Sequence, residues 1–94
     1  MPDFQLSGGA WRLSPQVALR PESFGALAYH FGTRRLSFLK SRELLEVVNR
    51  LESEPDPAAA CRAAGVGPAR LPSYERALRT LAETGMIVPV AEAA

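Results

Sequence analysis

The spacing of apolar residues changes once along the chain, at Ser41, and this change limits the elements that the chain can form. Before it, residues 16–21 and 26–31 alternate apolar and other side chains, which is the pattern of β-strands. After it, apolar residues recur about every 3.6 positions, as on one face of an amphipathic helix. These residues are Leu44, Leu45, Val48 and Leu51. The sequence therefore predicts strands followed by helices.

Residues 32–33, Gly-Thr, separate the second alternating run from a third one and predict a two-residue type II′ hairpin turn. This turn fixes a register in which Tyr29 opposes Leu36 on one face and His30 opposes Arg35 on the other. The large apolar residues then share a face, which supports the register independently. With the pair closing the turn hydrogen-bonded, the alternation of bonded pairs predicts which residues of the third strand turn their backbone groups outward. They are Arg35, Ser37 and Leu39.

Residues that favour helix ends divide the rest of the chain into three helices. The expected N-caps are Ser41, Asp56 and Ser73, and the second and third helices are expected to stop at Gly65 and Gly85. The order is a three-stranded antiparallel sheet followed by three helices, the last two forming a helix-turn-helix pair. This is an α+β domain of the winged helix-turn-helix-like type.

Length and composition are those of one small domain, because 94 residues with a hydrophobic fraction of 47% build a single core. We expect it to span residues 11–89, between a flexible N-terminus at 1–10 and a flexible tail at 90–94. Trp11 and Leu13 extend the first strand backward, and Pro15 marks a break in it. No apolar run is long enough to span a membrane and no signal peptide is apparent, so a cytoplasmic protein without a membrane partner is expected.

The chain carries one cysteine and one histidine, which excludes an internal disulfide and a four-ligand zinc site of the usual kind. Cys61 lies in an Ala-rich helix and is expected in the core, while His30 is expected on the polar, surface side of the hairpin. No phosphate-binding glycine loop is present in its usual context. We therefore expect no enzyme, no metal and no cofactor.

Charge is distributed unevenly along the chain. Residues 1–40 carry five arginine or lysine side chains against two acidic ones, a net charge of +3. Such a basic half suggests an acidic partner, although an ordinary mixed surface is equally consistent with it.

Two binding functions fit the predicted fold. A helix-turn-helix DNA-binding regulator would read DNA with the third helix, but residues 66–94 are neutral and Arg76 and Arg79 stand beside Glu75 and Glu83. A peptide-binding module would instead use the third strand, whose free edge accepts another strand. An edge that is merely blunted by its cations is equally consistent with the pattern.

A resemblance to a known protein family favours the peptide-binding function. The run WRLSPQVALRPESFGALAYHFGTRRLSFLKSRELLEVVNRL, followed by AACRAAGV and LPSYERALRTLAETGMIVP, resembles the mycofactocin biosynthesis chaperone family, relatives of the peptide chaperone of pyrroloquinoline quinone synthesis. The similarity covers residues 11–89. It implies a precursor-peptide recognition domain that adds the leader of a ribosomally made peptide as a further strand.

Carried over by position, the resemblance implies a site with two parts. The pairing edge is supplied by Arg34, Arg35, Leu36, Ser37, Phe38 and Leu39. The groove beside it is lined by Tyr74, Ala77, Leu78 and Leu81 of the third helix. The implied partner is a radical S-adenosylmethionine maturase, which decarboxylates the C-terminal tyrosine of the precursor and joins it to the adjacent valine. Iron–sulfur clusters and S-adenosylmethionine belong to that enzyme, and neither nucleic acid nor a membrane is an implied partner of this chain.

Overall fold

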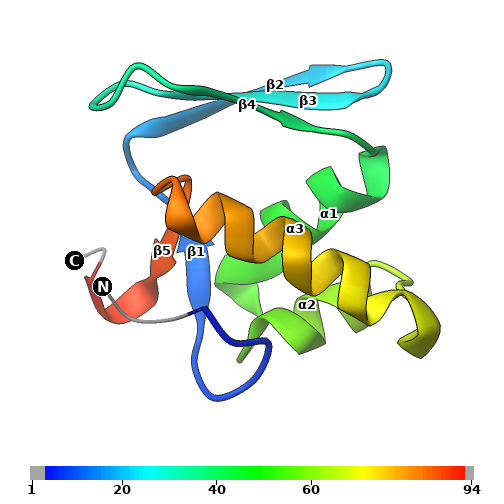
Figure 1. The fold of residues 1–94 in the computed structure, drawn as a ribbon. Coiled ribbons are helices and arrows are strands. Elements are labelled where there is room, and N and C mark those ends of the chain that lie inside the picture. The colour runs from blue at the N-terminus through cyan, green and yellow to red at the C-terminus, as the bar shows by residue number, and fades with distance from the viewer. Residues whose placement is uncertain (1–3, 93–94) are drawn as a thin grey trace.

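A three-stranded antiparallel sheet forms one layer of the protein, whose computed structural model describes residues 4–92. Its strands, in spatial order, are β2 (Val17–Glu22), β3 (Gly25–His30) and β4 (Leu36–Leu39). The second layer consists of α1 (Arg42–Arg50), α2 (Pro57–Ala63) and α3 (Leu71–Glu83). All three helices lie on the same side of the sheet, and no element of the described chain covers its other face (Figure 1). The α+β class is thus confirmed.

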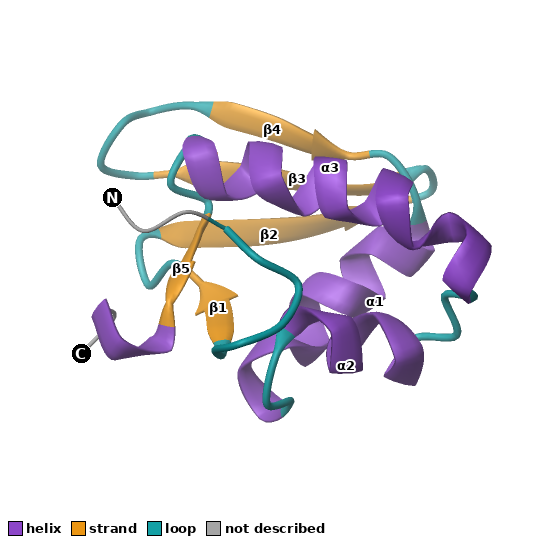
Figure 2. Ribbon diagram, turned by 60° about the horizontal axis from the view of Figure 1, so that its bottom comes forward, coloured by secondary structure: helices purple, strands orange, loops and turns teal. Residues whose placement is uncertain are grey.

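A second, two-stranded sheet brings the two ends of the domain together. It pairs β1 (Trp11–Leu13) with β5 (Ile87–Pro89) in antiparallel fashion. The expectation that Trp11 and Leu13 extend the first strand of the main sheet was wrong. A turn after β1, in which the Val17 amide donates to the Ser14 carbonyl at 3.0 Å, redirects the chain and leaves β1 to pair with β5. Figure 2 shows these two short strands crossing beneath the main sheet.

The chain outside the predicted domain is partly described. Residues 1–3 and 93–94, which belong to the predicted flexible ends, lie outside the described residues. Phe4 is buried and packs edge-on against Trp11, with ring centroids 5.1 Å apart. The Leu6 carbonyl accepts a hydrogen bond from the Ala58 amide at 2.8 Å, so the segment before β1 lies against α2. The C-terminal segment forms a 3₁₀ turn at Val90–Glu92.

The predicted hairpin register is confirmed, but the predicted type II′ turn is wrong. Tyr29 opposes Leu36 as expected. The connection, however, is a four-residue loop in which the Arg34 amide donates to the His30 carbonyl at 2.7 Å and Arg34, rather than Gly32, has a positive φ of 62°. A four-residue loop centred on the same dipeptide gives the same opposed pairs as a two-residue turn, so the register was correct although the turn was not.

His30 determines the shape of this loop and is buried, contrary to the expectation of a surface position. Its Nδ1 accepts hydrogen bonds from the amides of Gly32 and Thr33 at 3.0 and 3.1 Å. Only 8% of the residue is exposed. The imidazole thereby satisfies backbone donors that the loop leaves unpaired.

The face of the main sheet with the smaller side chains is the one that packs against the helices. Residue size alone would suggest the opposite face. The inner face, toward the helices, carries small residues of β3 that are almost wholly buried, Ala26 and Ala28, next to Leu39 of β4. The core beneath them is completed by Val47 of α1 and Leu78 of α3. The larger apolar residues occupy the opposite, outer face. Small inner residues allow the helices to approach the sheet closely.

Most helix ends lie where the sequence places them. The Ser41 Oγ accepts from the Leu44 amide at 2.9 Å, and an Asp56 carboxylate oxygen accepts from the Ala59 amide at the same distance. Gly65 and Gly85 follow α2 and α3 with positive φ, as predicted. Ser73 is not the N-cap of α3, because a 3₁₀ turn at Pro68–Arg70 leads directly into the helix. Among the described residues no helix is long and apolar enough to cross a membrane.

Candidate functional site

β4 is one of the two edge strands of the main sheet, and β2 is the other. Two hydrogen bonds show which backbone groups of β4 point outward. The Phe31 amide donates to the Gln16 carbonyl at 2.8 Å, and the His30 amide donates to the Arg35 carbonyl at 3.0 Å. Odd residues of β3 therefore bond to β2 and even residues to β4. By the same alternation, Leu36 and Phe38 turn their N–H and C=O groups outward.

The prediction that Arg35, Ser37 and Leu39 face outward was consequently wrong. It followed from the assumed two-residue turn, in which Phe31 and Arg34 would form the hydrogen-bonded pair. The four-residue loop keeps the opposed pairs but moves the bonded pair to His30 and Arg35, which exchanges the bonded and non-bonded positions along β4.

The six residues predicted as the pairing edge divide into three groups. Arg34 and Arg35 are exposed at the hairpin loop. Leu36 and Phe38 present both side chain and backbone to the surface, with 60% and 59% of each residue exposed. Ser37 is half-buried and Leu39 is wholly buried on the inner face. The side chain of Leu39 therefore packs beneath the edge and is not accessible from the surface.

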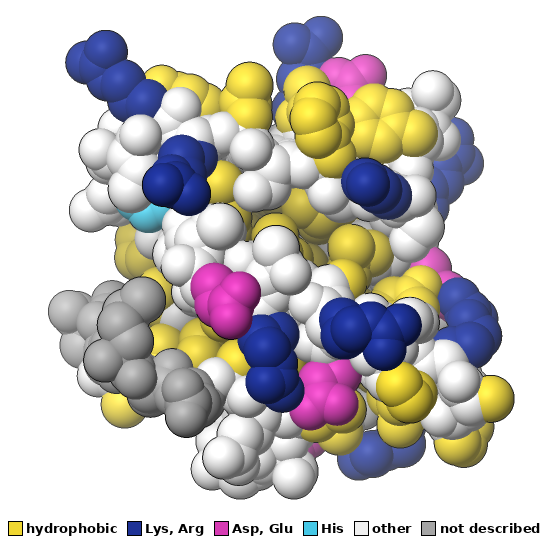
Figure 3. Space-filling view, viewed as in Figure 1, with side chains coloured by type: hydrophobic (Ala, Val, Ile, Leu, Met, Phe, Trp, Pro, Cys, Tyr) yellow, Lys and Arg dark blue, Asp and Glu magenta, His cyan; other side chains and the backbone are white. Residues whose placement is uncertain are grey.

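The four residues predicted on the third helix lie on the face of α3 that turns toward the molecule. Leu78 is wholly buried, and Leu81 and Tyr74 are nearly so. Ala77 is half-buried and is the most accessible of the four. A hollow separates the β4 edge from α3, with hydrophobic surface visible at its floor and Lys and Arg side chains on both borders (Figure 3). Leu78 belongs to the core behind this hollow.

A polar cluster that the sequence analysis did not identify joins the starts of α1 and α3. The Tyr74 hydroxyl donates to Glu43 Oε1 at 2.5 Å. Both terminal nitrogens of Arg70 bond to the same carboxylate, and the guanidinium lies over the Tyr74 ring at 5.4 Å. The hydrogen bonds from Arg70 and Tyr74 hold the pKa of Glu43 below its usual value. Burial, followed by the bond to Glu43, raises the pKa of Tyr74.

This cluster lies at the junction between β4 and α1, because β4 ends at Leu39 and α1 begins at Arg42. The sequence analysis gave Glu43 no role and placed Tyr74 only in the groove beside the third strand. Their contact joins residues 31 positions apart and had no local signal.

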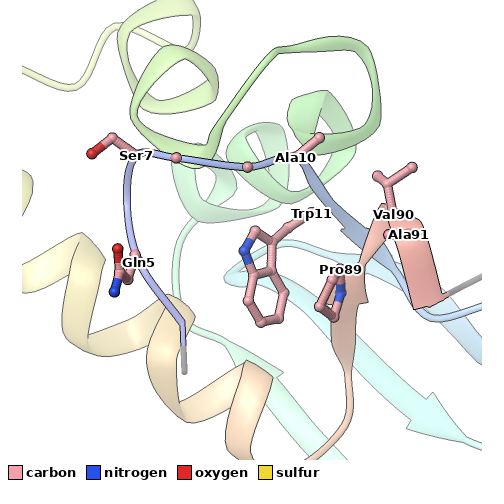
Figure 4. Close-up of a pocket in the computed structure, with 9 residues that line it drawn as sticks. Gln5, Ser7, Ala10, Trp11, Pro89, Val90 and Ala91 are labelled. Atoms are coloured by element: carbon pink, nitrogen blue, oxygen red, sulfur yellow. The ribbon is translucent and has the colours of Figure 1, made fainter. Parts of the chain in front are cut away.

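Two cavities in the described structure lie away from the β4 edge. One of about 510 Å³ opens between the segment before β1 and the segment after β5, beside Trp11 and Pro89 (Figure 4). Another, of about 610 Å³, lies between the β2–β3 turn and α1. Both are open to solvent.

Cys61, the free thiol, is wholly buried, and burial raises its pKa.

The helix-turn-helix pair offers little free positive charge on α3. Arg79 bonds to Glu75 of the same helix at 3.0 Å, and Arg70, just before the helix, is held by Glu43. Within the described structure, Arg76 of α3 and Arg62 of α2 are exposed and form no ion pair. This arrangement does not concentrate charge for phosphate contacts.

Together, the fold and the site define a small winged-helix-like α+β module with an open strand edge and a hollow beside it. The chain belongs to the peptide chaperone MftB family, whose model matches residues 10–88. This confirms the family resemblance of the sequence and the expectation of a chaperone rather than an enzyme.

Curated relatives carry the same description. The peptide chaperone MftB of Mycobacterium tuberculosis is 58% identical over 79 residues, covering 84% of this chain and 72% of the relative. That of Mycolicibacterium smegmatis is 55% identical over 80 residues, covering 85% and 78%. No solved structure matches the chain significantly.

Proposed function

We propose that this chaperone binds the leader of a ribosomally made precursor peptide as an added strand beside β4, and presents it to a radical S-adenosylmethionine maturase in mycofactocin biosynthesis. The relatives are named peptide chaperones, which supports a peptide as the ligand. In this proposal residues 11–89 form the recognition domain, and the maturase carries out all of the chemistry.

The observation that carries the proposal is the open edge of β4. This strand ends the order β2–β3–β4, and no element within residues 4–92 pairs with its outer side. The outward groups of Leu36 and Phe38 form a row of donors and acceptors that fits an extended peptide. Each new backbone hydrogen bond contributes roughly 1 kcal/mol net.

Side chains of the peptide would alternate between the two faces of the extended sheet. Those on the inner side enter the hollow toward Ala77 and Ser37, and those on the outer side lie beside Leu36 and Phe38. Apolar groups buried there contribute about 25 cal/mol per Å². Backbone pairing then supplies affinity, and the alternating side chains set the register of the peptide.

Charge around the edge suits an acidic leader. Arg34 and Arg35 precede β4, Lys40 follows it, and all three are exposed. Of the residues described, none forms an ion pair with these cations. They would attract carboxylates, and salt should weaken that attraction.

A DNA-binding role has less support, because the arginines around α3 are largely engaged in ion pairs. One titration separates the two functions. The purified protein is mixed with the precursor peptide and, separately, with duplex DNA, and binding is followed by fluorescence anisotropy at physiological salt. Saturable binding of the peptide without retention of DNA is the expected result, and the opposite result would refute the proposal.

A second measurement tests presentation. The maturase is incubated with the precursor with and without this protein, and mass spectrometry follows the decarboxylated product. We expect the chaperone to raise turnover and to leave the precursor unchanged when incubated with it alone.

A further inference from the structure

The outer face of the main sheet is largely apolar, and no element within residues 4–92 covers it. Four of the five large hydrophobic residues that are exposed among the described residues lie on it or at its border: Phe24, Phe31, Leu36 and Phe38. The fifth, Val90, belongs to the C-terminal 3₁₀ turn. Antiparallel sheets with one solvated face usually carry polar residues there. This face does not follow that rule.

These four side chains form one continuous surface with two half-buried neighbours, Leu27 and Tyr29. The surface is here called the apolar patch: Phe24, Leu27, Tyr29, Phe31, Leu36 and Phe38. Phe24 and Phe38 have ring centroids 6.1 Å apart, and Tyr29 and Phe31 are in edge-on contact at 5.4 Å. The register places Leu36 opposite Tyr29, and Phe38 opposite Leu27. Figure 3 shows hydrophobic side chains gathered along the top of the molecule, over the sheet. Contiguous exposed aromatics of this kind mark interaction surfaces.

The charge at the border of the patch indicates what kind of partner fits. Arg34 and Lys40 flank β4 and form no ion pair within residues 4–92. On β2, Arg20 is already paired with Glu22 at 2.8 Å. A second copy of this chain would bring the same uncompensated cations against one another. A partner with carboxylates around an apolar surface would neutralise them.

We propose that the apolar patch is the docking surface for the enzyme that modifies the bound peptide, through an apolar surface of that enzyme bordered by carboxylates. This inference rests on the proposed function, and it separates two sites. The peptide occupies the edge of β4, while the enzyme covers the outer face of the same sheet.

The geometry of strand addition links the two sites. A peptide strand beside β4 sends every second side chain to the outer face, next to Leu36 and Phe38. It thereby enlarges the apolar patch. An enzyme docked there contacts chaperone and peptide together, so the peptide should strengthen its binding.

A double variant, Phe24→Ser with Phe31→Ser, tests the patch without touching β4. Both residues are exposed and lie in loops, so the fold should be kept, which circular dichroism would verify. Val90→Ser is the matched control, an exposed apolar residue away from the sheet. We expect the double variant to lose about tenfold or more in affinity for the purified maturase, as when aromatic anchors leave an interface. Its affinity for the precursor peptide, and both affinities of Val90→Ser, should stay within about twofold of the original protein.

Three outcomes would overturn the inference. The first is an unchanged affinity of the folded double variant for the maturase. The second is an equal loss of peptide binding, which would make the patch a peptide site. The third is that the original protein sediments as a dimer and the double variant as a monomer, which would make the patch a contact between copies. Failure of the proposed function is distinct, since the original protein would then not bind the peptide at all.

Discussion

Gly25 lies against the backbone of Leu39 so closely that a Cβ on Gly25 would overlap the Leu39 carbonyl oxygen and come within 2.8 Å of the Ser41 amide nitrogen. The glycine begins β3 where β4 ends, and its φ of 150° is one that side chains of L residues rarely adopt. The close approach allows the chain to leave β4 and cap α1 immediately with Ser41. It therefore fixes where the sheet edge stands relative to the helices.

Gly25→Ala should destabilise the protein, because the added carbon clashes with backbone that cannot move away easily. We expect a loss of about 2–4 kcal/mol in the free energy of unfolding. Gly67→Ala is the control, since Gly67 has a φ of −75° and open space around it. Urea titrations of both variants measure the difference. A Gly25→Ala protein as stable as the control would contradict the close approach.

Proline substitutions along β4 should separate peptide binding from folding. Phe38→Pro removes an amide that points outward, so the domain should stay folded while the peptide loses a hydrogen bond. Phe38→Ala is the control for the lost ring. Ser37→Pro removes an amide that bonds into β3, and it should cost up to about 3 kcal/mol, the value found in helix interiors.

Thermal melts and peptide titrations of the three variants measure both effects. Phe38→Pro should bind the peptide more weakly than Phe38→Ala does. Equal affinities of these two folded variants would refute strand addition at this edge. If Ser37→Pro were as stable as the original protein, the assignment of inward amides would be wrong.

How far the sequence predicts this structure depends on whether a feature is local. Strand register, the caps at Ser41 and Asp56, and the stop glycines follow from short patterns, and the structure confirms them. The turn was mispredicted because the buried ring of His30 binds the loop amides, and a ring's burial depends on tertiary packing. The sequence also could not show which face of the hairpin meets the helices, since the face with larger residues is the exposed one.

The sequence predicted that the strand after the hairpin loop is an edge strand, but not how its backbone groups are directed. Of the predicted residues 34–39, only Leu36–Leu39 form the edge strand β4, while Arg34 and Arg35 lie in the hairpin loop. The direction of each backbone group required the loop geometry. The cluster of Glu43, Arg70 and Tyr74 depends on the contact between the starts of α1 and α3, and no local sequence pattern indicates it.

Glu43 should make stability depend on pH. Its pKa is lowered in the folded protein by Arg70 and Tyr74, so its contribution is present above the ordinary glutamate value of 4.5 and is lost as pH falls through the lowered pKa. Glu43→Gln should lower the melting temperature near pH 7, and this difference should shrink in acid. Glu46→Gln, on the exposed side of the same helix, is the control and should have a small effect. A pH-independent difference for Glu43→Gln would contradict the charge-based role of the cluster.

Cys61 should react slowly with thiol reagents in the folded protein. The residue is wholly buried, and burial raises its pKa, so both access and the thiolate fraction are reduced. Absorbance after addition of a disulfide reagent should rise slowly in buffer and rapidly in denaturant. Fast reaction of the native protein would show that the α2 region opens readily.

The cations beside β4 should act mainly on the rate at which an acidic peptide associates. Arg34→Glu with Arg35→Glu should lower the association rate on the order of tenfold at low salt, because exposed charges steer encounters more than they hold the complex. Dissociation should change little. Arg62→Glu, on the exposed side of α2, is the control for a reversed charge far from the edge.

Stopped-flow mixing with the precursor peptide at low and high salt measures these rates. The difference between the double variant and the original protein should narrow as salt screens the charges. A loss that is equal at both salt concentrations, or that appears in dissociation alone, would mean that the two arginines contact the bound peptide directly and do not steer it.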